Sequence, residues 1–427
     1  MSQPRTASPA LPIQALMFAG AALVMLGNYY AYDSIAPVAE QLSRELHFSD
    51  TQIGSLNAIY SLPNIFLVLL GGVLVDRFSA RGMVLATTAL CLVGALITAL
   101  GAQFPVMAAG RLLFGIGSET LAVATTVALA QWFTGRYFAF LFAANLSLAR
   151  LGSSLADLST SYASGLYARG WQPPLWLAFG FAVVSFAGAL IYFYCDRREA
   201  PRGTLALPPP PERFDWRHLL TFRTEYWVLV AVCVTFYSVI FPFRSTFAIK
   251  YLQEAHGLTQ AAAGRINSLV FLATVFATPV FGLLLDRLGR NTTMLVAGSC
   301  LLPLSFLVLG MVSGGAAWSS ALLGVSFSFL PAVLWPTVVR YAPPEHLGTA
   351  YGAMTALQNA GLTLANFAAG YLNDSNHASA ANPEGYMPML WFFGLVSLTA
   401  FACTLILWLL DHGASPLART APSGAPN

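Results

Sequence analysis

The sequence predicts an all-α membrane protein of twelve transmembrane helices, arranged as two pseudo-symmetric six-helix halves with both termini in the cytoplasm. Three observations predict this fold class: an apolar composition, long apolar runs and a repeat with constant spacing. Of the 427 residues, 57% are hydrophobic and only 9% are charged, whereas soluble domains carry about 25% charged residues. This composition excludes a soluble globule and a disordered chain. A net charge of +3 gives no reason to expect nucleic-acid binding.

Twelve segments are long and apolar enough to cross a bilayer, which takes about 20 residues in a helix. Transmembrane strands would be about half as long and would alternate between polar and apolar residues. These segments are longer and uniformly apolar, so strands are not expected. The first segment is expected to be a retained span rather than a cleaved signal peptide. The expected spans are residues 13–36, 52–75, 83–101, 105–131, 138–166, 173–194, 226–252, 261–285, 293–313, 317–341, 348–373 and 386–410.

Arginine and lysine residues fix the expected orientation, because cytoplasmic loops are rich in them. With the N-terminus in the cytoplasm, 14 of the 21 basic residues lie inside, and only Arg44, Arg169 and Lys250 lie outside. The other four basic residues lie within spans. The chain is therefore expected to be a multi-pass protein of the cell inner membrane.

Residues 13–194 form the expected N-terminal half, and residues 226–410 form the expected C-terminal half. Between them, residues 195–225 contain six arginines and a run of four prolines that starts at Pro208. This composition predicts a cytoplasmic linker that lies partly on the membrane surface. Residues 411–427 form the expected cytoplasmic tail.

An internal repeat relates the two halves at an offset of 210 residues. Asp76-Arg77 recurs as Asp286-Arg287 at this offset. The same offset relates three further pairs: Gly54 and Gly264, Asn57 and Asn267, and Gly72 and Gly282. Because six spans return the chain to its starting side, the two halves have the same orientation. Parallel repeats of this kind occur in secondary transporters with two six-helix halves.

Two loop segments carry a resemblance to a known family. Residues 71–81 (GGVLVDRFSAR) resemble the loop motif of the major facilitator superfamily, and residues 281–290 (FGLLLDRLGR) resemble its second copy. The first copy has Ser79-Ala80 where the family usually has a Gly-Arg pair. Residues 111–117 (RLLFGIG) are similar to the fourth-helix motif of the family. The resemblance extends over residues 13–410 and implies transport by alternating access.

A narrower resemblance is to the MFSD1-like branch, whose lysosomal members export dipeptides. The segments that carry it are residues 30–33 (YAYD), 111–123 (RLLFGIGSETLAV), 148–153 (LARLGS), 334–336 (LWP) and 347–352 (LGTAYG). This resemblance implies a small zwitterionic peptide as the substrate and places its binding at Glu119 and Arg150.

Glu119 and Arg150 also stand out without the resemblance, because a charged side chain inside a bilayer is costly. They lie in the fourth and fifth expected spans, each about 12 residues and so roughly 18 Å from the inner face. Two interpretations remain open: a structural ion pair, or a site in which Glu119 receives an ammonium group and Arg150 a carboxylate. We favour the site, because the offset places uncharged Phe329 and Ala360 at the corresponding positions.

A site with both charges fits a dipeptide, whose termini lie about two residues apart, at up to ~3.6 Å per residue. Trp335 precedes a proline in the tenth expected span, and we expect its ring to close over the substrate. Tyr60 and Asn359 are expected to line the same cavity. Packing remains the alternative for each of these three side chains.

Other charged residues are expected to control the conformational state. Asp33 and Arg244 lie at matching heights in the first and seventh expected spans, so they either pair at the outer gate or are simply hydrated at its mouth. Asp157 is either a proton site or a partner for Arg150. Proton coupling would require Glu119, Asp33 or Asp157.

The loop motifs supply further gating candidates. Asp76, Arg77, Asp286 and Arg287 lie at inner helix ends, where they are expected to latch the inner gate. Arg111 lies in the outer part of the fourth expected span. The family resemblance links an arginine there to protonation, and no carboxylate partner for it is evident.

The sequence therefore predicts a secondary-active or facilitative dipeptide transporter that works by rocker-switch alternating access as a monomer, with protons as the only further partner to consider. No metal site or cofactor is expected, and neither is an enzyme, because no nucleophile–base pair or cluster of metal ligands is evident. Two alternatives stay open. One is a transporter of organic anions, amino acids or drugs driven by protons, and the other is a non-transporting membrane sensor on the same scaffold.

Overall fold

The computed structural model describes residues 11–68, 79–133, 135–199, 219, 221–312, 314–343 and 346–413. Within these ranges the chain is almost entirely helical, and the one β-type contact is an isolated bridge between Ser379 and Asn382. Nine helical segments of the described chain are long and apolar enough to cross a membrane. They are Pro12–Leu46, Ala80–Leu100, Phe104–Trp132, Gln172–Glu199, Thr224–Glu254, Gln260–Leu285, Asn291–Met311, Ala316–Tyr341 and Pro383–His412.

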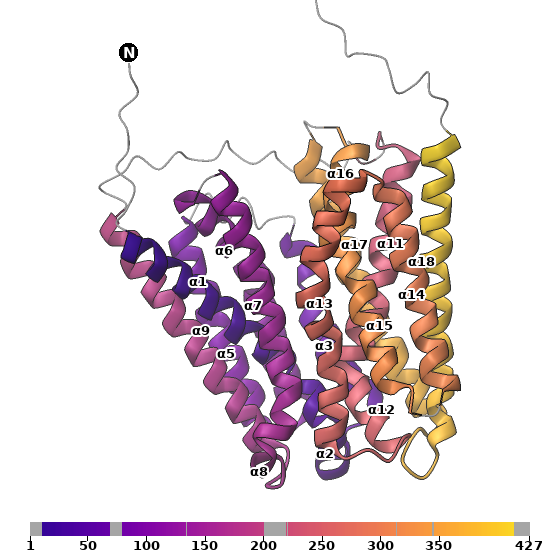
Figure 1. The fold of residues 1–427 in the computed structure, drawn as a ribbon. Helices are drawn as coiled ribbons and strands as arrows, with labels where there is room; N and C mark the ends of the chain where they lie inside the picture. The colour runs from indigo at the N-terminus through magenta and orange to yellow at the C-terminus, as the bar shows by residue number, and fades with distance from the viewer. Residues whose placement is uncertain are drawn as a thin grey trace, which may run out of the picture.

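Two groups of helices lie side by side in Figure 1. The N-terminal half contains α1 (Leu11–Tyr32), α2 (Ile35–Leu46), α3 (Asp50–Ser61), α5 (Ala80–Leu100), α6 (Phe104–Trp132), α7 (Gly135–Tyr162), α8 (Ser164–Tyr167) and α9 (Gln172–Glu199). The C-terminal half contains α11 (Thr224–Pro242), η2 (Phe243–Phe247), α12 (Ala248–Glu254), α13 (Gln260–Leu288), α14 (Asn291–Met311), α15 (Ala316–Phe329), η3 (Leu330–Leu334), α16 (Trp335–Tyr341), α17 (Leu347–Ser375), η5 (Pro383–Tyr386) and α18 (Met387–Gly413).

The helices follow the apolar runs of the sequence, with shifts at their ends. α3 begins at Asp50, before the expected start at residue 52, and α9 continues to Glu199, beyond the expected end at residue 194. The start of α3 is set by a capping box, in which Ser49 accepts a bond from the backbone N–H of Gln52. Caps of this kind are polar and local, so hydropathy does not register them. The count of twelve spans and the cytoplasmic position of the termini stay predictions.

Three of the long helical segments are broken inside the bundle. α11 gives way to the π-helical segment η2 after Pro242, and α15 gives way to η3, which contains Pro331. Proline has no N–H to donate to the preceding turn, so the helix must rearrange its hydrogen bonds around it. In the N-terminal half, Asp33 and Ser34 separate α1 from α2. The breaks place two charged residues, Asp33 and Arg244, in irregular or widened backbone that is fully buried in protein.

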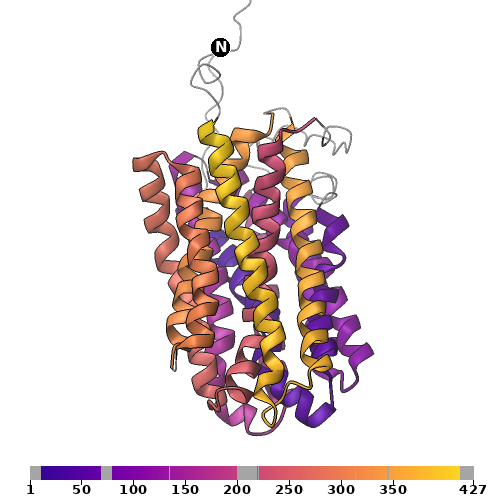
Figure 2. The ribbon, with the colours of Figure 1, turned by 90° about the vertical axis from the view of Figure 1, so that its right-hand side faces the viewer.

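The end of the bundle that carries Leu11 of α1 and Gly413 of α18 is called the terminal end, and the opposite end is called the closed end. Figure 2 shows α18 running the full height of the C-terminal half. The ribbons of the two halves diverge towards the terminal end (Figure 1). Between the halves, α3 packs against α17 and α7 packs against α13. We call these two helix contacts the seams. The 210-residue offset maps α3 onto α13 and α7 onto α17, so the repeat relates one seam to the other.

Two glycines related by the repeat allow the seams to close. A Cβ atom on Gly54 would lie 2.3 Å from the carbonyl oxygen of Asn366, and one on Gly264 would lie 2.4 Å from the carbonyl oxygen of Asp157. Only glycine permits backbones to approach this closely. The match of Gly54 with Gly264 in the sequence therefore has a packing reason at equivalent points of the two seams.

Candidate functional site

Arg150 lies on α7 and is surrounded by aromatic rings. Its guanidinium carbon lies 5.3 Å from the ring centroid of Tyr29, 5.6 Å from that of Phe241, 4.9 Å from that of Phe271 and 5.1 Å from that of Phe327. The three phenylalanines belong to the C-terminal half. The side chain is half-buried, and its Nη1 has no hydrogen-bond partner among the described residues. Because ring faces attract a cation without neutralising it, Arg150 retains a charge that an anion can bind.

Glu119 lies on α6 and is also half-buried. The hydroxyl of Tyr60 on α3 lies 3.0 Å from Ser118 Oγ and 3.5 Å from Glu119 Oε1. The side-chain amide of Asn28 donates to the same Ser118 oxygen at 2.7 Å. Ser118 and Tyr60 are therefore the polar neighbours of the Glu119 carboxylate. At 3.5 Å, the contact from the Tyr60 hydroxyl is too long to be a strong hydrogen bond to that carboxylate.

Glu119 and Arg150 are both half-buried and belong to helices α6 and α7, which contact each other. The ion pairs of the described chain, however, do not join these two residues. The structural ion pair that the sequence left open is therefore not formed in this conformation. Two opposite charges are instead held on neighbouring helices, and neither forms an ion pair with another residue that the structure describes.

Trp335 starts α16 directly after η3. Its indole N–H donates to the hydroxyl of Tyr237 at 3.2 Å, and the hydroxyl of Tyr351 donates to its carbonyl oxygen at 3.1 Å. The ring of Tyr237 stacks on Phe241 with a centroid distance of 5.5 Å. Since Phe241 is one of the rings beside Arg150, a continuous set of contacts leads from Trp335 to Arg150. The structure therefore brings Trp335 near the charged pair without placing it in direct contact.

Asn359 lies on α17 and is buried. Its side-chain amide donates to the carbonyl oxygen of Thr355 at 3.0 Å, while Oδ1 has no partner among the described residues. No hydrogen bond in the described chain joins Asn359 to Glu119 or Arg150. The structure thus leaves Asn359 apart from the other expected substrate contacts, with one unused acceptor.

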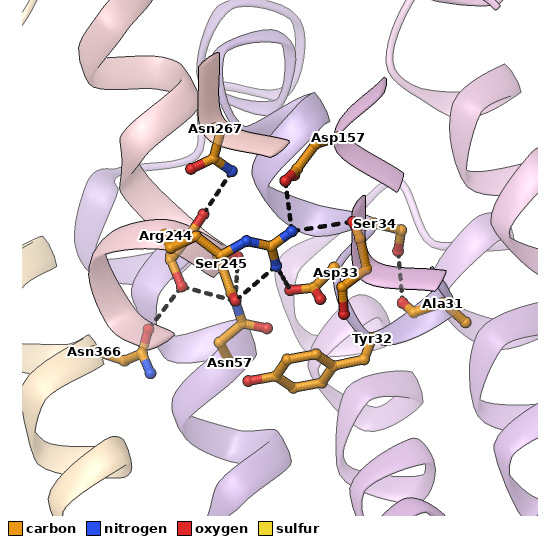
Figure 3. Close-up of polar contacts among 12 residues, drawn as sticks. Ala31, Tyr32, Asp33, Ser34, Asn57, Asp157, Arg244, Ser245, Asn267 and Asn366 are labelled. Atoms are coloured by element: carbon orange, nitrogen blue, oxygen red, sulfur yellow. Dashed lines mark hydrogen bonds and ion pairs between the residues drawn. The ribbon is translucent and has the colours of Figure 1, made fainter. Parts of the chain in front are cut away.

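Arg244 in η2 is the centre of a second buried polar group, which we call the gate triad: Arg244, Asp33 and Asp157 (Figure 3). Arg244 Nη1 lies 2.5 Å from Asp33 Oδ1, and Nη2 lies 2.5 Å from Asp157 Oδ2. All three side chains have zero exposure. Arg244 also donates to the carbonyl oxygen of Ser153 at 3.0 Å, so one arginine of η2 binds both α7 and the break between α1 and α2.

The gate triad decides between two of the sequence interpretations. The alternative that Asp33 and Arg244 are hydrated is wrong for this conformation, because both side chains are fully buried. The alternative that Asp157 is a partner for Arg150 is also wrong, because its carboxylate pairs with Arg244 instead. Sequence spacing placed Asp157 on the Arg150 face of its own helix, but it could not show that η2 brings a second arginine to that face.

Arg111 on α6 is buried and contacts no carboxylate within the described residues. It donates to the carbonyl oxygen of Tyr32 at 3.2 Å and to Asn57 Oδ1 at 2.5 Å. Asn57 Nδ2 in turn donates to the carbonyl oxygen of Ser245 at 3.0 Å and to Thr246 Oγ1 at 2.7 Å. Arg111 therefore holds the broken end of α1, next to Asp33, and is linked through Asn57 to η2.

A third polar group, which the sequence interpretation missed, lies at the closed end. We call it the closed-end latch: Asp50, Lys250, Asn373 and Asp374. Lys250 forms an ion pair with Asp50, and Asn373 Nδ2 donates to Asp50 Oδ2 at 2.8 Å. The carboxylate of Asp374 accepts bonds from the backbone N–H groups of Asp50 and Thr51, both at 2.8 Å. A residue of the C-terminal half thus caps the first helix turn of α3 in the N-terminal half.

The surroundings of Asp374 favour its ionised form. Burial opposes ionisation, but hydrogen bonds from the side chain of Thr51 and from the backbone N–H groups of Thr51 and Asp50 outweigh it and lower the pKa of Asp374. The sequence signal for the latch was Lys250, the single lysine of the chain. Its partner could not be read from the sequence, because Asp50 and Lys250 come together only when the two halves pack.

The residues expected to latch the inner gate are mostly not described. Asp76 and Arg77 lie outside the described residues, and for Asp286 only the backbone is described, within α13. Arg287 is exposed near the end of α13. From the first loop motif, Arg81 forms a 3.2 Å ion pair with Asp196 on α9. The inner-gate role of these residues stays a prediction.

No group of three or more His, Cys, Asp or Glu side chains in the described chain is arranged to hold a metal ion. Comparison with known proteins defines the class of this one. Residues 18–366 and 244–426 match the Major Facilitator Superfamily. The chain belongs to this superfamily and is a multi-pass membrane transporter rather than an enzyme.

Within the superfamily, the chain groups with the MFSD1-like branch. It is 32% identical to the lysosomal dipeptide transporter MFSD1 of Danio rerio over 398 residues, which cover 90% of this chain and 84% of that protein. It is 31% identical to MFSD1 of Homo sapiens over 394 residues, which cover 89% and 83% of the two chains.

Solved structures share the fold. An auto-inhibited POT family peptide transporter is 14% identical, with a TM-score of 0.72 over 97% of this chain and 99% of that one. A mutant form of the nucleoside transporter NupG is 13% identical, also with a TM-score of 0.72, over 92% of this chain and 100% of that one. Because a peptide transporter and a nucleoside transporter share this fold, the fold alone does not identify a substrate.

Proposed function

We propose that this protein moves dipeptides across the cell inner membrane by alternating access, with Glu119 receiving the peptide ammonium group and Arg150 its carboxylate. The observation that carries the proposal is the arrangement of these two charges. They lie on neighbouring helices, are half-buried, and have no ion-pair partner in the described chain. A buried charge without a partner is costly, and a zwitterion supplies both partners at once.

The relatives support the same substrate class. The MFSD1 proteins that match most of the chain are lysosomal dipeptide transporters. The structural difference between a dipeptide and a free amino acid is the separation of the two charged groups. Because no ion pair between Glu119 and Arg150 is present in the described chain, a dipeptide does not have to break one to contact both side chains with its two termini.

The orientation follows from the charge distribution. We place the terminal end in the cytoplasm, so that the closed end faces outwards. The gate triad and the closed-end latch then form the outer gate, and because both join the two halves, we assign this structure to an inward-facing state. In this state Trp335, Tyr60 and Asn359 line the path to the substrate, and rocking of the two halves about the charged pair exposes it alternately to the two sides.

Uptake of a labelled dipeptide into proteoliposomes tests the proposal. Glu119→Gln and Arg150→Ala each remove one charged contact, and we expect each to raise the KM for L-alanyl-L-alanine by about 10- to 100-fold. Glu384→Gln and Arg169→Ala are matched controls, because both side chains are exposed. Uptake that persists with unchanged KM in the double variant Glu119→Gln/Arg150→Ala would refute the proposed site.

The alternatives give different outcomes in the same system. A thermal-shift screen that finds stabilisation by free amino acids or dicarboxylates, and not by dipeptides, would point to a proton-driven transporter of another substrate. Repeating uptake with and without a pH gradient measures whether protons are coupled. Dipeptide binding without flux in reconstituted protein would indicate a sensor on the same scaffold.

A further inference from the structure

Phe271 on α13 contacts two arginines that belong to different polar groups. Its ring centroid lies 4.9 Å from the guanidinium carbon of Arg150 and 4.1 Å from that of Arg244. The two guanidinium carbons are therefore at most about 9 Å apart. The Phe271 side chain is completely buried. Through its two contacts, this one ring connects Arg150 of the candidate substrate site to Arg244 of the gate triad.

The two contacts of Phe271 join different parts of the protein. Phe271 and Arg244 both belong to the C-terminal half, so they stay together when the halves move as rigid bodies. Arg150 belongs to the N-terminal half, on α7, and α7 packs against α13 at the seam. The contact between Phe271 and Arg150 is therefore an inter-half contact that depends on the conformation of the seam.

The two arginines also differ in how their charge is balanced. Arg244 is held between the carboxylates of Asp33 and Asp157. Arg150 has no carboxylate partner in the described chain, and the C-terminal half presents aromatic rings to it instead. The quadrupole of an aromatic ring stabilises a cation that has lost water, without cancelling its charge. The rings therefore hold Arg150 and leave it free to bind an anion.

The repeat does not account for these rings. Residues 31, 61 and 117 correspond at the 210-residue offset to the three phenylalanines Phe241, Phe271 and Phe327, and they are Ala31, Ser61 and Gly117. All three N-terminal equivalents are small. Duplicated architecture alone does not require aromatic side chains at these positions. In this structure the three rings pack against one another, and each also contacts Arg150.

We propose that Phe271 is a positioning residue that holds the Arg150 guanidinium when no substrate is bound, and so allows the unloaded transporter to change conformation. Without the ring, the empty site would have to close around an unpaired charge, which is costly. A substrate carboxylate takes over this role by binding Arg150 directly, so the loaded transporter does not need the ring to reorient. This inference rests on the proposed function, because it requires a carboxylate at Arg150.

Two transport assays separate the loaded and unloaded steps. Net uptake of L-alanyl-L-alanine into empty proteoliposomes requires the unloaded protein to return, whereas exchange against internal dipeptide does not. In Phe271→Leu, we expect net uptake to fall about tenfold while exchange changes by less than about twofold. Phe271→Tyr keeps the ring and should retain net uptake. The matched control is Phe236→Leu, since Phe236 is a buried phenylalanine of α11 for which no contact with an arginine is found in the described chain.

Unchanged net uptake in folded Phe271→Leu, or an equal loss of net uptake and exchange, would overturn the inference and leave the proposed function standing. If the leucine variant is not monodisperse, Phe271→Met fills the space with a flexible apolar side chain and enters the same comparison. If the unsubstituted protein neither binds, exchanges nor takes up the dipeptide, then the proposed function and this inference fail together.

Discussion

Arg244 Nη1 of the C-terminal half lies 2.5 Å from Asp33 Oδ1 of the N-terminal half. Asp157, which lies on α7, contacts the same guanidinium group, with 2.5 Å between its Oδ2 and Arg244 Nη2. The gate triad thus contains two carboxylates and one arginine, all without solvent exposure. An arrangement of this kind stabilises contact between the halves only while all three members are present, because removal of one leaves a buried charge without its partner.

We expect Arg244→Ala to open the closed end. The substitution leaves Asp33 and Asp157 buried without their cation, which destabilises the closed conformation by about 3–5 kcal/mol. Hydrogen–deuterium exchange at the first turns of α3 and α13 reports the opening, and both segments should exchange faster. Arg169→Ala, at an exposed position, is the control. Unchanged exchange in Arg244→Ala would show that the triad does not hold the gate.

We expect Gly264→Ala to prevent closure of the seam. Its Cβ would lie 2.4 Å from the carbonyl oxygen of Asp157, whereas a Cβ on Gly282 of the same helix meets nothing within 4 Å. Overpacking of this kind typically costs about 1–3 kcal/mol, and here the cost falls only on the closed conformation. Dipeptide uptake should therefore drop about tenfold in Gly264→Ala and stay near its normal rate in Gly282→Ala. Equal rates in the two variants would contradict the role of the glycine seam.

We expect Asp374→Asn to loosen the start of α3. The asparagine has no negative charge to interact with the helix N-terminus, a loss of about 0.5–2 kcal/mol. The amides of Asp50 and Thr51 should then exchange faster, by up to about 30-fold, in the peptide that contains them. Glu384→Gln removes an exposed carboxylate from η5 and should change nothing. An effect of equal size in both variants would assign it to overall charge.

The latch should also weaken at acidic pH. The pKa of Asp374 is lowered in the closed conformation because the hydrogen bonds from Thr51 and Asp50 outweigh burial, and it returns towards the ordinary value of about 3.9 when the halves separate. Asp374 therefore stabilises the closed conformation above about pH 4, and this contribution disappears as the pH falls through its lowered pKa. Exchange at the start of α3, corrected for the intrinsic effect of pH, should show this loss. The loss should be absent in Asp374→Asn, and an identical pH profile in that variant would exclude Asp374 as its source.

The helical membrane architecture could be predicted from the sequence, because the bilayer demands long apolar segments; the orientation that the arginines indicate stays a prediction. The helical membrane fold and the membership of the transporter family are confirmed. The repeat also had predictive value: Gly54 and Gly264 lie at equivalent points of two seams that exchange under its offset.

The site was less accessible to the sequence. Glu119 and Arg150 stood out because charged residues are rare inside membrane segments, and their part in binding stays a proposal. The rings around Arg150 did not stand out, since phenylalanine is common in such segments. The pairing of Asp157 with Arg244 and the contacts of Asp374 depend on the register between two halves, which local spacing along one helix does not determine.

The backbone N–H groups at the start of α3 find hydrogen-bond acceptors in both halves of the protein. The side chains of Ser49 and Gln52, from its own half, satisfy two of them, and Asp374 of the other half satisfies the N–H groups of Asp50 and Thr51. If the halves part as the proposed alternating access requires, only the second pair loses its acceptor. Because the Ser49–Gln52 cap lies wholly within the N-terminal half, we expect such a movement to leave α3 wound, with hydration of two amides replacing the lost carboxylate.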